Sequence, residues 1–445
     1  MNDLVQIQVL FGDQRTNRHV DPSSYSVSRA SRTSDMGRKI VPQAAGCKDD
    51  TPERPACPSC GAQCRHTARS ILARYNLPPV QPQNEPEQTT SKATSMRLRA
   101  HSHAFLLAVA AGLAAVCCDN DGPVEPPSLP VTPADLSLPH QNERCLTGVI
   151  HASHDIAAVV DTFASHTGAL PRTIGTYFDF TASPGEVYRV CTAIAATGAQ
   201  PYITLDQKIW TGLHAPDSAI PSDSLLAGAY DTFLRAVADT LLAFGDTVVL
   251  RFNHEHNGDW YPYSVVRQGG GADSNGNDTC DGIERYVESW RYVHNLFTRA
   301  GAANVRWFYC VNAESFPDKP WNRPFSAYPG DSFVDLVGLD VYSHASTGAD
   351  VPSAAQLCVV FVDDYRELGL EKPVAIGELG CNEIDNVPEM KAGWIREAFE
   401  VAWYMGAECM WYFDCRGSTA DFRLITEQCR EAYRDGMALD SAYFK

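Results

Sequence analysis

Two glutamates stand in surroundings that suit carboxylate chemistry. Glu255 lies in the segment RFNHEHNGDWYPY (251–263), after a β-branched run and just before an Asn-Gly step and several aromatic residues. Glu378 follows a second apolar run and precedes Gly380. Aromatic rings beside such a carboxylate can stack on the apolar faces of sugar rings. Two carboxylates on two strand ends are what cleavage of a glycosidic bond with retention needs, one as acid and then base, the other as nucleophile.

The elements that must position these glutamates follow a regular pattern. Short apolar runs alternate with amphipathic segments eight times from about residue 140 onward. Unbroken apolar strands that alternate with helices indicate a parallel sheet, and eight such units favour a single α/β domain, a (β/α)₈ TIM barrel. The absence of Gly-x-Gly-x-x-Gly after the first run disfavours a dinucleotide-binding fold. The predicted strands are 147–151, 173–178, 201–205, 248–254, 305–311, 334–341, 373–378 and 409–413.

Helices are predicted between these strands, and functional side chains are expected where the strands end. The predicted helices include 185–196, 225–243, 284–300, 354–368, 389–402 and 425–432. The carboxyl ends of barrel strands form the active face, which gives as candidates His151, Asp179, Asp206, His254, Glu255, Asn312, Asp340, Tyr342, Glu378 and Trp411. Arg251 lies inside the fourth strand, so it is expected to pair with a carboxylate, because a buried arginine needs a partner.

Four segments resemble one known family. RFNHEHNGDW (251–260) resembles the strand-four signature of glycoside hydrolase family 26. RWFYCVN (306–312), YPGDSFVDLVGLDVYS (328–343) and KPVAIGELG (372–380) are similar to its strand-five, strand-six and nucleophile blocks. The resemblance covers about residues 145–435. It implies a retaining endo-β-glycanase of the β-mannanase type that needs no cofactor.

The resemblance also assigns roles to individual residues. Glu255 would be the acid/base and Glu378 the nucleophile. The supporting residues would be His254, Tyr342, Arg251, Asn257 and Asn312, with Tyr342 hydrogen-bonded to the nucleophile and His254 bracing the carboxylates. Substrate would contact Trp260, Trp411, Tyr261, Asp206 and His151, the two tryptophans as sugar platforms. The expected substrate is β-1,4-mannan, with mixed-linkage β-glucan and β-1,3-xylan as alternatives.

Some residues depart from the family pattern and keep other interpretations open. His256 and Asp206 differ from the residues usual there, and both are expected to affect substrate specificity at the rim. His254, His256, Asp259 and Asp340 could instead ligate zinc in a metal-dependent hydrolase, although the first strand lacks the His-x-His of such barrels. A barrel that binds carbohydrate without turnover is a third possibility. The main interpretation involves no metal.

The composition limits partners and location. The net charge is −18 over 445 residues, which disfavours nucleic acid as a partner and leaves a neutral polysaccharide and a monomeric protein as the expectation. Residues 1–95 are expected to be disordered or an upstream extension that is not translated. Residues 96–118 have the layout of a bacterial export signal, and Cys117 and Cys118 stand where a signal of lipoprotein type would be cleaved and acylated. Residues 119–140 form a Pro-rich linker before the catalytic domain at 141–445, so we expect a secreted or lipid-anchored envelope protein whose nine domain cysteines could partly pair.

Overall fold

The computed structural model describes residues 130–138, 142–212, 216–345, 351–384, 387–417 and 420–445. The predicted upstream extension, export segment and most of the linker lie outside these ranges and remain predictions. Among the described residues, none of the helices combines the length and the apolar character that crossing a membrane requires. The eight buried cysteines of these ranges are thiols, so no disulfide among them supports the barrel.

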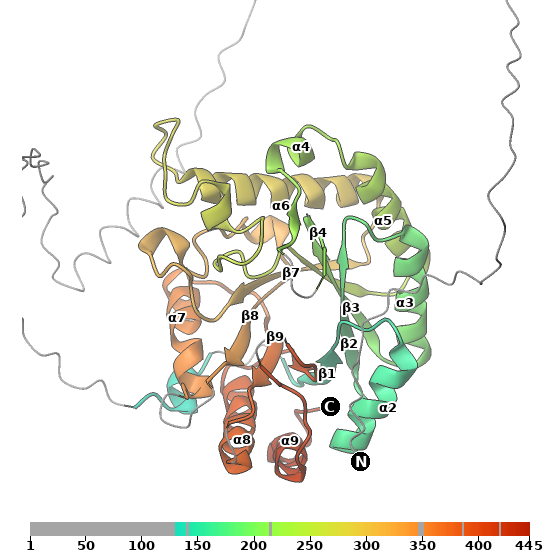
Figure 1. The fold of residues 1–445 in the computed structure, drawn as a ribbon, viewed down its shortest axis with the longest axis vertical. Helices are drawn as coiled ribbons and strands as arrows, with labels where there is room; N and C mark the ends of the chain where they lie inside the picture. Colours follow the sequence, from blue (N-terminus) through green and yellow to red (C-terminus); the bar gives the residue numbers. More distant parts are fainter. Residues whose placement is uncertain (1–129, 139–141, 213–215, 346–350, 385–386, 418–419) are drawn as a thin grey trace, which may run out of the picture. The chain divides into compact units, whose positions relative to one another are not determined.

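Eight parallel strands close into a barrel, as predicted (Figure 1). Their order around the barrel is β1-β10-β9-β8-β7-β6-β3-β2, so β1 pairs with both the last strand and the second. Each strand is almost wholly buried because helices cover its outer face and side chains fill the interior. The strands are β1 Leu146–Ile150, β2 Thr173–Asp179, β3 Gln200–Asp206, β6 Val248–Phe252, β7 Val305–Asn312, β8 Leu336–Ser343, β9 Val374–Cys381 and β10 Cys409–Phe413.

Helices surround the barrel, and short elements decorate the connections (Figure 1). The α-helices are α2 Ile156–Thr167, α3 Pro184–Ala196, α4 Ser222–Leu226, α5 Asp231–Phe244, α6 Asp281–Ala300, α7 Ala354–Glu367, α8 Pro388–Tyr404 and α9 Glu427–Leu439. A two-stranded hairpin, β4 Lys208–Ile209 and β5 Ser218–Ala219, follows β3. The 3₁₀ helices are η1 Pro133–Leu136, η2 Val265–Gln268, η3 Pro320–Asn322 and η4 Asp331–Phe333.

Several predicted boundaries were wrong for identifiable physical reasons. The helix predicted over 225–243 is two helices, because Gly228 with φ 82° ends α4 before α5 begins. The fourth strand ends at Phe252 rather than residue 254, because Asn253 adopts φ 47° and leaves the extended conformation. The seventh strand runs on to Cys381, so Glu378 lies within a strand and not at its last residue.

Side chains of alternate strand residues separate into two cores. On β2, Ile174 and Phe178 face the helices and join the large outer core, whereas Tyr177 packs against the cluster inside the barrel. Tyr202 and Trp411 lie at the centre of this inner cluster, with ring centroids 4.2 Å apart. The Arg251 guanidinium carbon lies 5.2 Å above the Tyr202 ring. The polar side chains around Arg251 therefore pack directly against the aromatic rings of this inner cluster.

Candidate active site

A row of polar side chains crosses three adjacent strands inside the barrel. Tyr177 on β2 is in register with Thr204 on β3, and Thr204 with Arg251 on β6. Residues in register on parallel strands lie at the same height, so these side chains meet directly. The Thr204 hydroxyl accepts a hydrogen bond from Arg251 Nε at 2.9 Å, which fixes the orientation of the guanidinium.

Arg251 on β6 pairs with two carboxylates, one on β8 and one on β9. It is fully buried, and Nη1 donates to both oxygens of Asp340 at 2.9 and 2.8 Å. Nη2 donates to Glu378 Oε1. Asp340 on β8 is itself in register with Glu378 on β9. The guanidinium thus supplies hydrogen bonds to two buried carboxylates, although burial still raises the pKa of Asp340 above its ordinary value.

Glu378 receives hydrogen bonds from three sides. Besides Arg251, the Tyr177 hydroxyl donates to Oε1 at 2.7 Å and the Tyr342 hydroxyl donates to Oε2. Burial opposes ionisation of Glu378, but the charge of Arg251 and the hydrogen bonds from the two tyrosines outweigh it and lower the pKa. Glu378 is therefore held as a carboxylate, the form that can act as a nucleophile.

Glu255 is held in a different way, by a loop immediately after β6. Its backbone has φ 52°, a left-handed conformation that is uncommon for a residue with a side chain. The Glu255 N–H donates to the Cys310 carbonyl at 2.9 Å, and the Glu255 carbonyl accepts the Gly258 N–H at 3.0 Å. The carboxylate accepts a hydrogen bond from Trp260 Nε1 at 2.8 Å. These contacts hold a conformation that the isolated chain would disfavour.

The two glutamates have opposite pKa shifts. Burial and the negative charge of Glu378 raise the pKa of Glu255 to about 8, although the Trp260 hydrogen bond opposes the increase. Glu255 is thus protonated at neutral pH while Glu378 is ionised. A protonated acid beside an ionised carboxylate is the arrangement that general acid catalysis with a nucleophile requires.

His254 lies beside both glutamates. Its Nε2 is 4.0 Å from Glu255 Oε2 and 3.9 Å from Glu378 Oε1, and it contacts the Tyr261 hydroxyl at 3.1 Å. Burial and Arg251 lower the pKa of His254, so the ring is neutral. Its Nδ1 lies 3.1 Å from Asp206 Oδ1, which assigns the ring proton to Nδ1 and leaves Nε2 as an acceptor.

Asp206 orients His254 and does not line the substrate cleft. Its side chain is 1% exposed, accepts the Tyr263 hydroxyl at 3.0 Å and lies 3.3 Å from Lys208 Nζ. Burial opposes its ionisation, but His254 and Lys208 keep the pKa of Asp206 below its ordinary value. The prediction that Asp206 binds substrate is therefore wrong, because no open face of the carboxylate is left.

The two predicted sugar platforms have different positions. Trp260 is 42% exposed and lies beside the exposed ring of Phe316, with centroids 5.7 Å apart. Trp411 is fully buried in the inner cluster, where its indole N–H donates to Thr173 Oγ1 at 3.0 Å. Trp260 can therefore meet a sugar ring, whereas Trp411 cannot. The platform prediction for Trp411 is wrong because this residue lies one layer below the mouth.

His256 is also buried and does not reach the rim. Its side chain is covered by Tyr286 and Tyr309, and Nε2 lies 2.6 Å from the Tyr309 hydroxyl and 3.2 Å from the Pro324 carbonyl. Burial lowers the pKa of His256 to about 4, so the ring is neutral. The expectation that His256 touches the substrate is wrong.

The remaining predicted residues support loops around the mouth. Asn257 is buried and joins its own loop to the end of β7, donating to the Asn312 carbonyl at 2.8 Å and accepting the Asn312 N–H at 2.9 Å. The Asn312 side chain donates to the Glu314 carbonyl. His151 Nδ1 accepts the Ser153 N–H at 2.8 Å just after β1, and burial lowers its pKa.

The residues do not fit the zinc site considered above. His256 Nε2 contacts Tyr309 and the Pro324 carbonyl, and His256 does not belong to the group of potential ligands around His254. Among the described residues, one group brings potential ligand atoms within 4.8 Å of one another, namely His254, Asp340 and Glu378. Arg251 already lies between its two carboxylates and supplies the positive charge that a cation would bring. The donor set therefore suits an arginine and not a metal.

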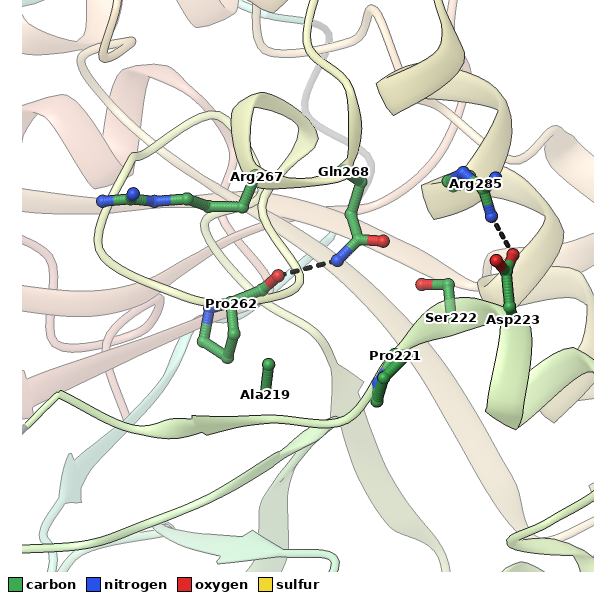
Figure 2. Close-up of a pocket in the computed structure, with 8 residues that line it drawn as sticks. All are labelled: Ala219, Pro221, Ser222, Asp223, Pro262, Arg267, Gln268 and Arg285. Atoms are coloured by element: carbon green, nitrogen blue, oxygen red, sulfur yellow. Dashed lines mark hydrogen bonds and ion pairs between the residues drawn. The ribbon is translucent and has the colours of Figure 1, made fainter.

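A separate pocket of about 480 Å³ lies next to the loop that carries Trp260 (Figure 2). Neither Glu255 nor Glu378 lines it. Four of its lining residues bond each other in pairs, since Arg285 pairs with Asp223 and Gln268 donates to the Pro262 carbonyl at 2.7 Å. The lining residues are Ala219, Pro221, Ser222, Asp223, Pro262, Arg267, Gln268 and Arg285.

Sequence reasoning missed two aromatic residues of the site. Tyr177 contacts Glu378, and the alternation of side chains along β2, which turns Thr173 and Tyr177 to the same inner side, could have identified it. Phe413 is half-buried, two residues beyond Trp411 on β10, with its ring edge-on to Tyr342 at 5.8 Å. Phe413 therefore occupies the height at the mouth that had been expected for Trp411.

The barrel and the paired glutamates form an arrangement that glycoside hydrolysis can use, and the chain is similar to proteins of that class. Residues 223–400 match the model of Glycosyl hydrolase family 26. The eight-stranded fold is shared with the catalytic domain of the Bacillus sp. JAMB-750 GH26 endo-beta-1,4-mannanase. That structure has a TM-score of 0.50 at 18% identity, over 68% of this chain and 87% of that chain.

Two curated relatives align with parts of the chain. Endoglucanase H of Acetivibrio thermocellus is 28% identical over 220 residues, which are 48% of this chain and 23% of that protein. A mannan endo-1,4-beta-mannosidase of Bacillus subtilis is 30% identical over 159 residues, which are 34% of this chain and 36% of that protein. The matches thus span about a quarter to a third of the length of these relatives.

Proposed function

We propose that the barrel hydrolyses a β-linked polysaccharide with retention of anomeric configuration, and that β-1,4-mannan is its substrate. The observation that carries this proposal is that the pKa values of Glu255 and Glu378, which both lie beside the His254 imidazole, are shifted in opposite directions. Burial and a neighbouring charge keep Glu255 protonated, whereas Arg251 and two tyrosines keep Glu378 ionised. These are the two protonation states with which the first step of a retaining hydrolysis begins.

The reaction has two steps in this scheme. Glu378 attacks the anomeric carbon and forms a glycosyl ester, while Glu255 gives its proton to the departing glycosidic oxygen. Glu255, now ionised, takes a proton from a water molecule whose oxygen attacks the same carbon and releases Glu378. The exposed ring of Trp260, bonded to Glu255 through its indole N–H, suits a sugar bound next to the acid.

The choice of substrate rests on the relatives. The family match and the relative named mannan endo-1,4-beta-mannosidase favour mannan. A second candidate is mixed-linkage β-glucan, because another relative is named Endoglucanase H. β-1,3-Xylan remains an alternative that the same chemistry would permit.

Release of reducing sugar from mannan, lichenan, xylan and cellulose tests the proposal. The expected result is the fastest release from mannan, loss of that release in the Glu378→Ala variant, and a first product with the β configuration by proton NMR. An α product would rule out retention. Unchanged hydrolysis by the alanine variant would remove Glu378 from the mechanism, and binding without any product would identify a carbohydrate-binding barrel.

A further inference from the structure

Tyr177 is a half-buried tyrosine on β2 whose hydroxyl points at the nucleophile. Its partner atom is Glu378 Oε1, at 2.7 Å, the same oxygen that accepts a hydrogen bond from Arg251. The backbone around Tyr177 is held from outside, because His154 Nε2 lies 3.1 Å from the Tyr177 carbonyl and His154 Nδ1 pairs with Glu186. The hydroxyl position is therefore fixed by both strand register and this outer contact.

The two carboxylate oxygens of Glu378 accept different numbers of hydrogen bonds. A carboxylate oxygen has two lone pairs in the plane of the group. Among the described residues, both lone pairs of Oε1 have donors, Arg251 and Tyr177, whereas Oε2 has one donor, Tyr342. One lone pair of Oε2 is therefore left to form a new bond.

We propose that Tyr177 is a positioning residue that, with Arg251, occupies Oε1 and so makes Oε2 the attacking atom of Glu378. This inference rests on the proposed retaining mechanism. In the first step the free lone pair of Oε2 forms the bond to the anomeric carbon. The bond to the leaving oxygen breaks with its electron pair, and that oxygen takes the proton of Glu255. Oε1 becomes the carbonyl oxygen of the ester and keeps its hydrogen bond from Tyr177.

The matched control is Tyr202. Both rings flank the same guanidinium, whose central carbon lies 5.7 Å from the Tyr177 ring and 5.2 Å from the Tyr202 ring. The Tyr202 hydroxyl is buried and makes no hydrogen bond within the described residues. Tyr177→Phe and Tyr202→Phe therefore each remove one hydroxyl from the same cluster, but only Tyr177→Phe removes a donor to the nucleophile.

The experiment measures kcat/KM against pH for wild type and both variants, on the polysaccharide that the wild type cleaves. For Tyr177→Phe we expect kcat/KM to fall about tenfold, since a hydrogen bond to a charged group is lost. The acid limb of its kcat/KM profile should move to higher pH, because the ionised form of Glu378 loses a hydrogen-bond donor. Tyr202→Phe should leave the limb in place. Circular dichroism checks that each variant is folded.

Two outcomes would overturn the inference while leaving the proposed function intact. One is an unmoved acid limb in Tyr177→Phe together with an inactive Glu378→Ala variant. The other is an equal shift in Tyr202→Phe, which would assign the effect to the aromatic surroundings of Arg251. An active Glu378→Ala variant would instead overturn the proposed function itself.

A trapped intermediate tests the atom assignment without steady-state turnover. An activated 2-deoxy-2-fluoro-β-glycoside should accumulate the ester on wild-type Glu378, and a crystal structure would show which oxygen carries the sugar. We expect the bond at the oxygen facing Tyr342, with the Tyr177 hydroxyl still bonded to the carbonyl oxygen. A sugar bonded to the oxygen that faces Tyr177 would contradict the inference.

Discussion

Glu378 and Glu255 are both buried carboxylates beside His254, yet their surroundings differ in almost every other respect. Glu378 lies within β9 and accepts hydrogen bonds from Arg251, Tyr177 and Tyr342. Glu255 lies in a loop at φ 52° and accepts one from Trp260. Burial penalises charge on both, and only Glu378 has a cation close enough to reverse the penalty. The number and charge of the hydrogen-bond donors therefore shift the pKa values of two chemically identical groups in opposite directions.

The variant with the largest expected effect is Glu378→Ala, which removes the carboxylate that accepts hydrogen bonds from three side chains. We expect kcat to fall roughly 10⁴-fold or more, because no other described group can form the ester. Azide should partly restore turnover of an activated aryl β-glycoside by filling the vacated space, and the product should be the α-glycosyl azide. Rescue that yields a β product would show that Glu378 is not the attacking group.

Glu255→Gln removes the acidic proton of the other carboxyl group. The size of the resulting loss of activity should depend on the leaving group of the substrate. Loss of general acid catalysis should lower kcat on polysaccharide by about 10²- to 10⁴-fold. An activated aryl glycoside needs little protonation, so its ester should still form and then accumulate, because no base activates water. Mass spectrometry of the enzyme detects this ester. An equal loss of ester formation with good and poor leaving groups would contradict the acid role.

The opposite pKa shifts of the two glutamates predict that replacing each by glutamine changes the free energy of unfolding in opposite directions. The folded-state pKa of Glu255 is about 8 against an ordinary 4.5, so the folded state binds more protons between these values and stability falls as pH rises through that window. Glu255→Gln stays neutral and should therefore be more stable than wild type at pH 8. The Glu378 pKa is lowered, so its contribution is present above the ordinary carboxyl pKa and is lost as pH falls through the folded value.

Glu378→Gln should accordingly be less stable than wild type at pH 8. The loss is expected to reach about 3 kcal/mol, because Arg251 keeps a buried charge with a weaker partner. Urea unfolding of both glutamine variants and the wild type at pH 5 and pH 8 measures these changes in the free energy of unfolding. Changes of the same sign at pH 8 would mean that the two sites are not tuned in opposite directions.

The sequence allowed the barrel and both glutamates to be predicted, because each strand is an apolar run that is buried on both faces. It did not reveal which inner side chains lie at the mouth. Trp411 and Phe413 both face the barrel interior, but the register of β10 against β9 shifts between Met410 and Tyr412. Such a shift leaves no mark in a single sequence, so Trp411 was assigned to the wrong layer.

Polar residues next to the glutamates were mispredicted for a related reason. Asp206 and His256 are near the ends of their strands, but each is turned toward another buried polar group. Asn253 and Glu255 both have positive φ, which breaks the simple alternation of facing directions after β6. Where the backbone leaves the strand, the sequence no longer predicts which way a side chain points.

The smallest expected effect concerns Trp260, the one side chain that donates a hydrogen bond to the Glu255 carboxyl group among the described residues. Trp260→Phe keeps an aromatic ring at this exposed position but removes the indole N–H that stabilises the ionised form. The pKa of Glu255 should rise, so the alkaline limb of kcat/KM should move up by less than about one pH unit. Phe316→Leu is the matched control, because it removes the neighbouring exposed ring but no donor. If both variants alter KM and neither moves the limb, Trp260 acts only as a sugar platform, and the raised pKa of Glu255 is set by burial and Glu378 alone.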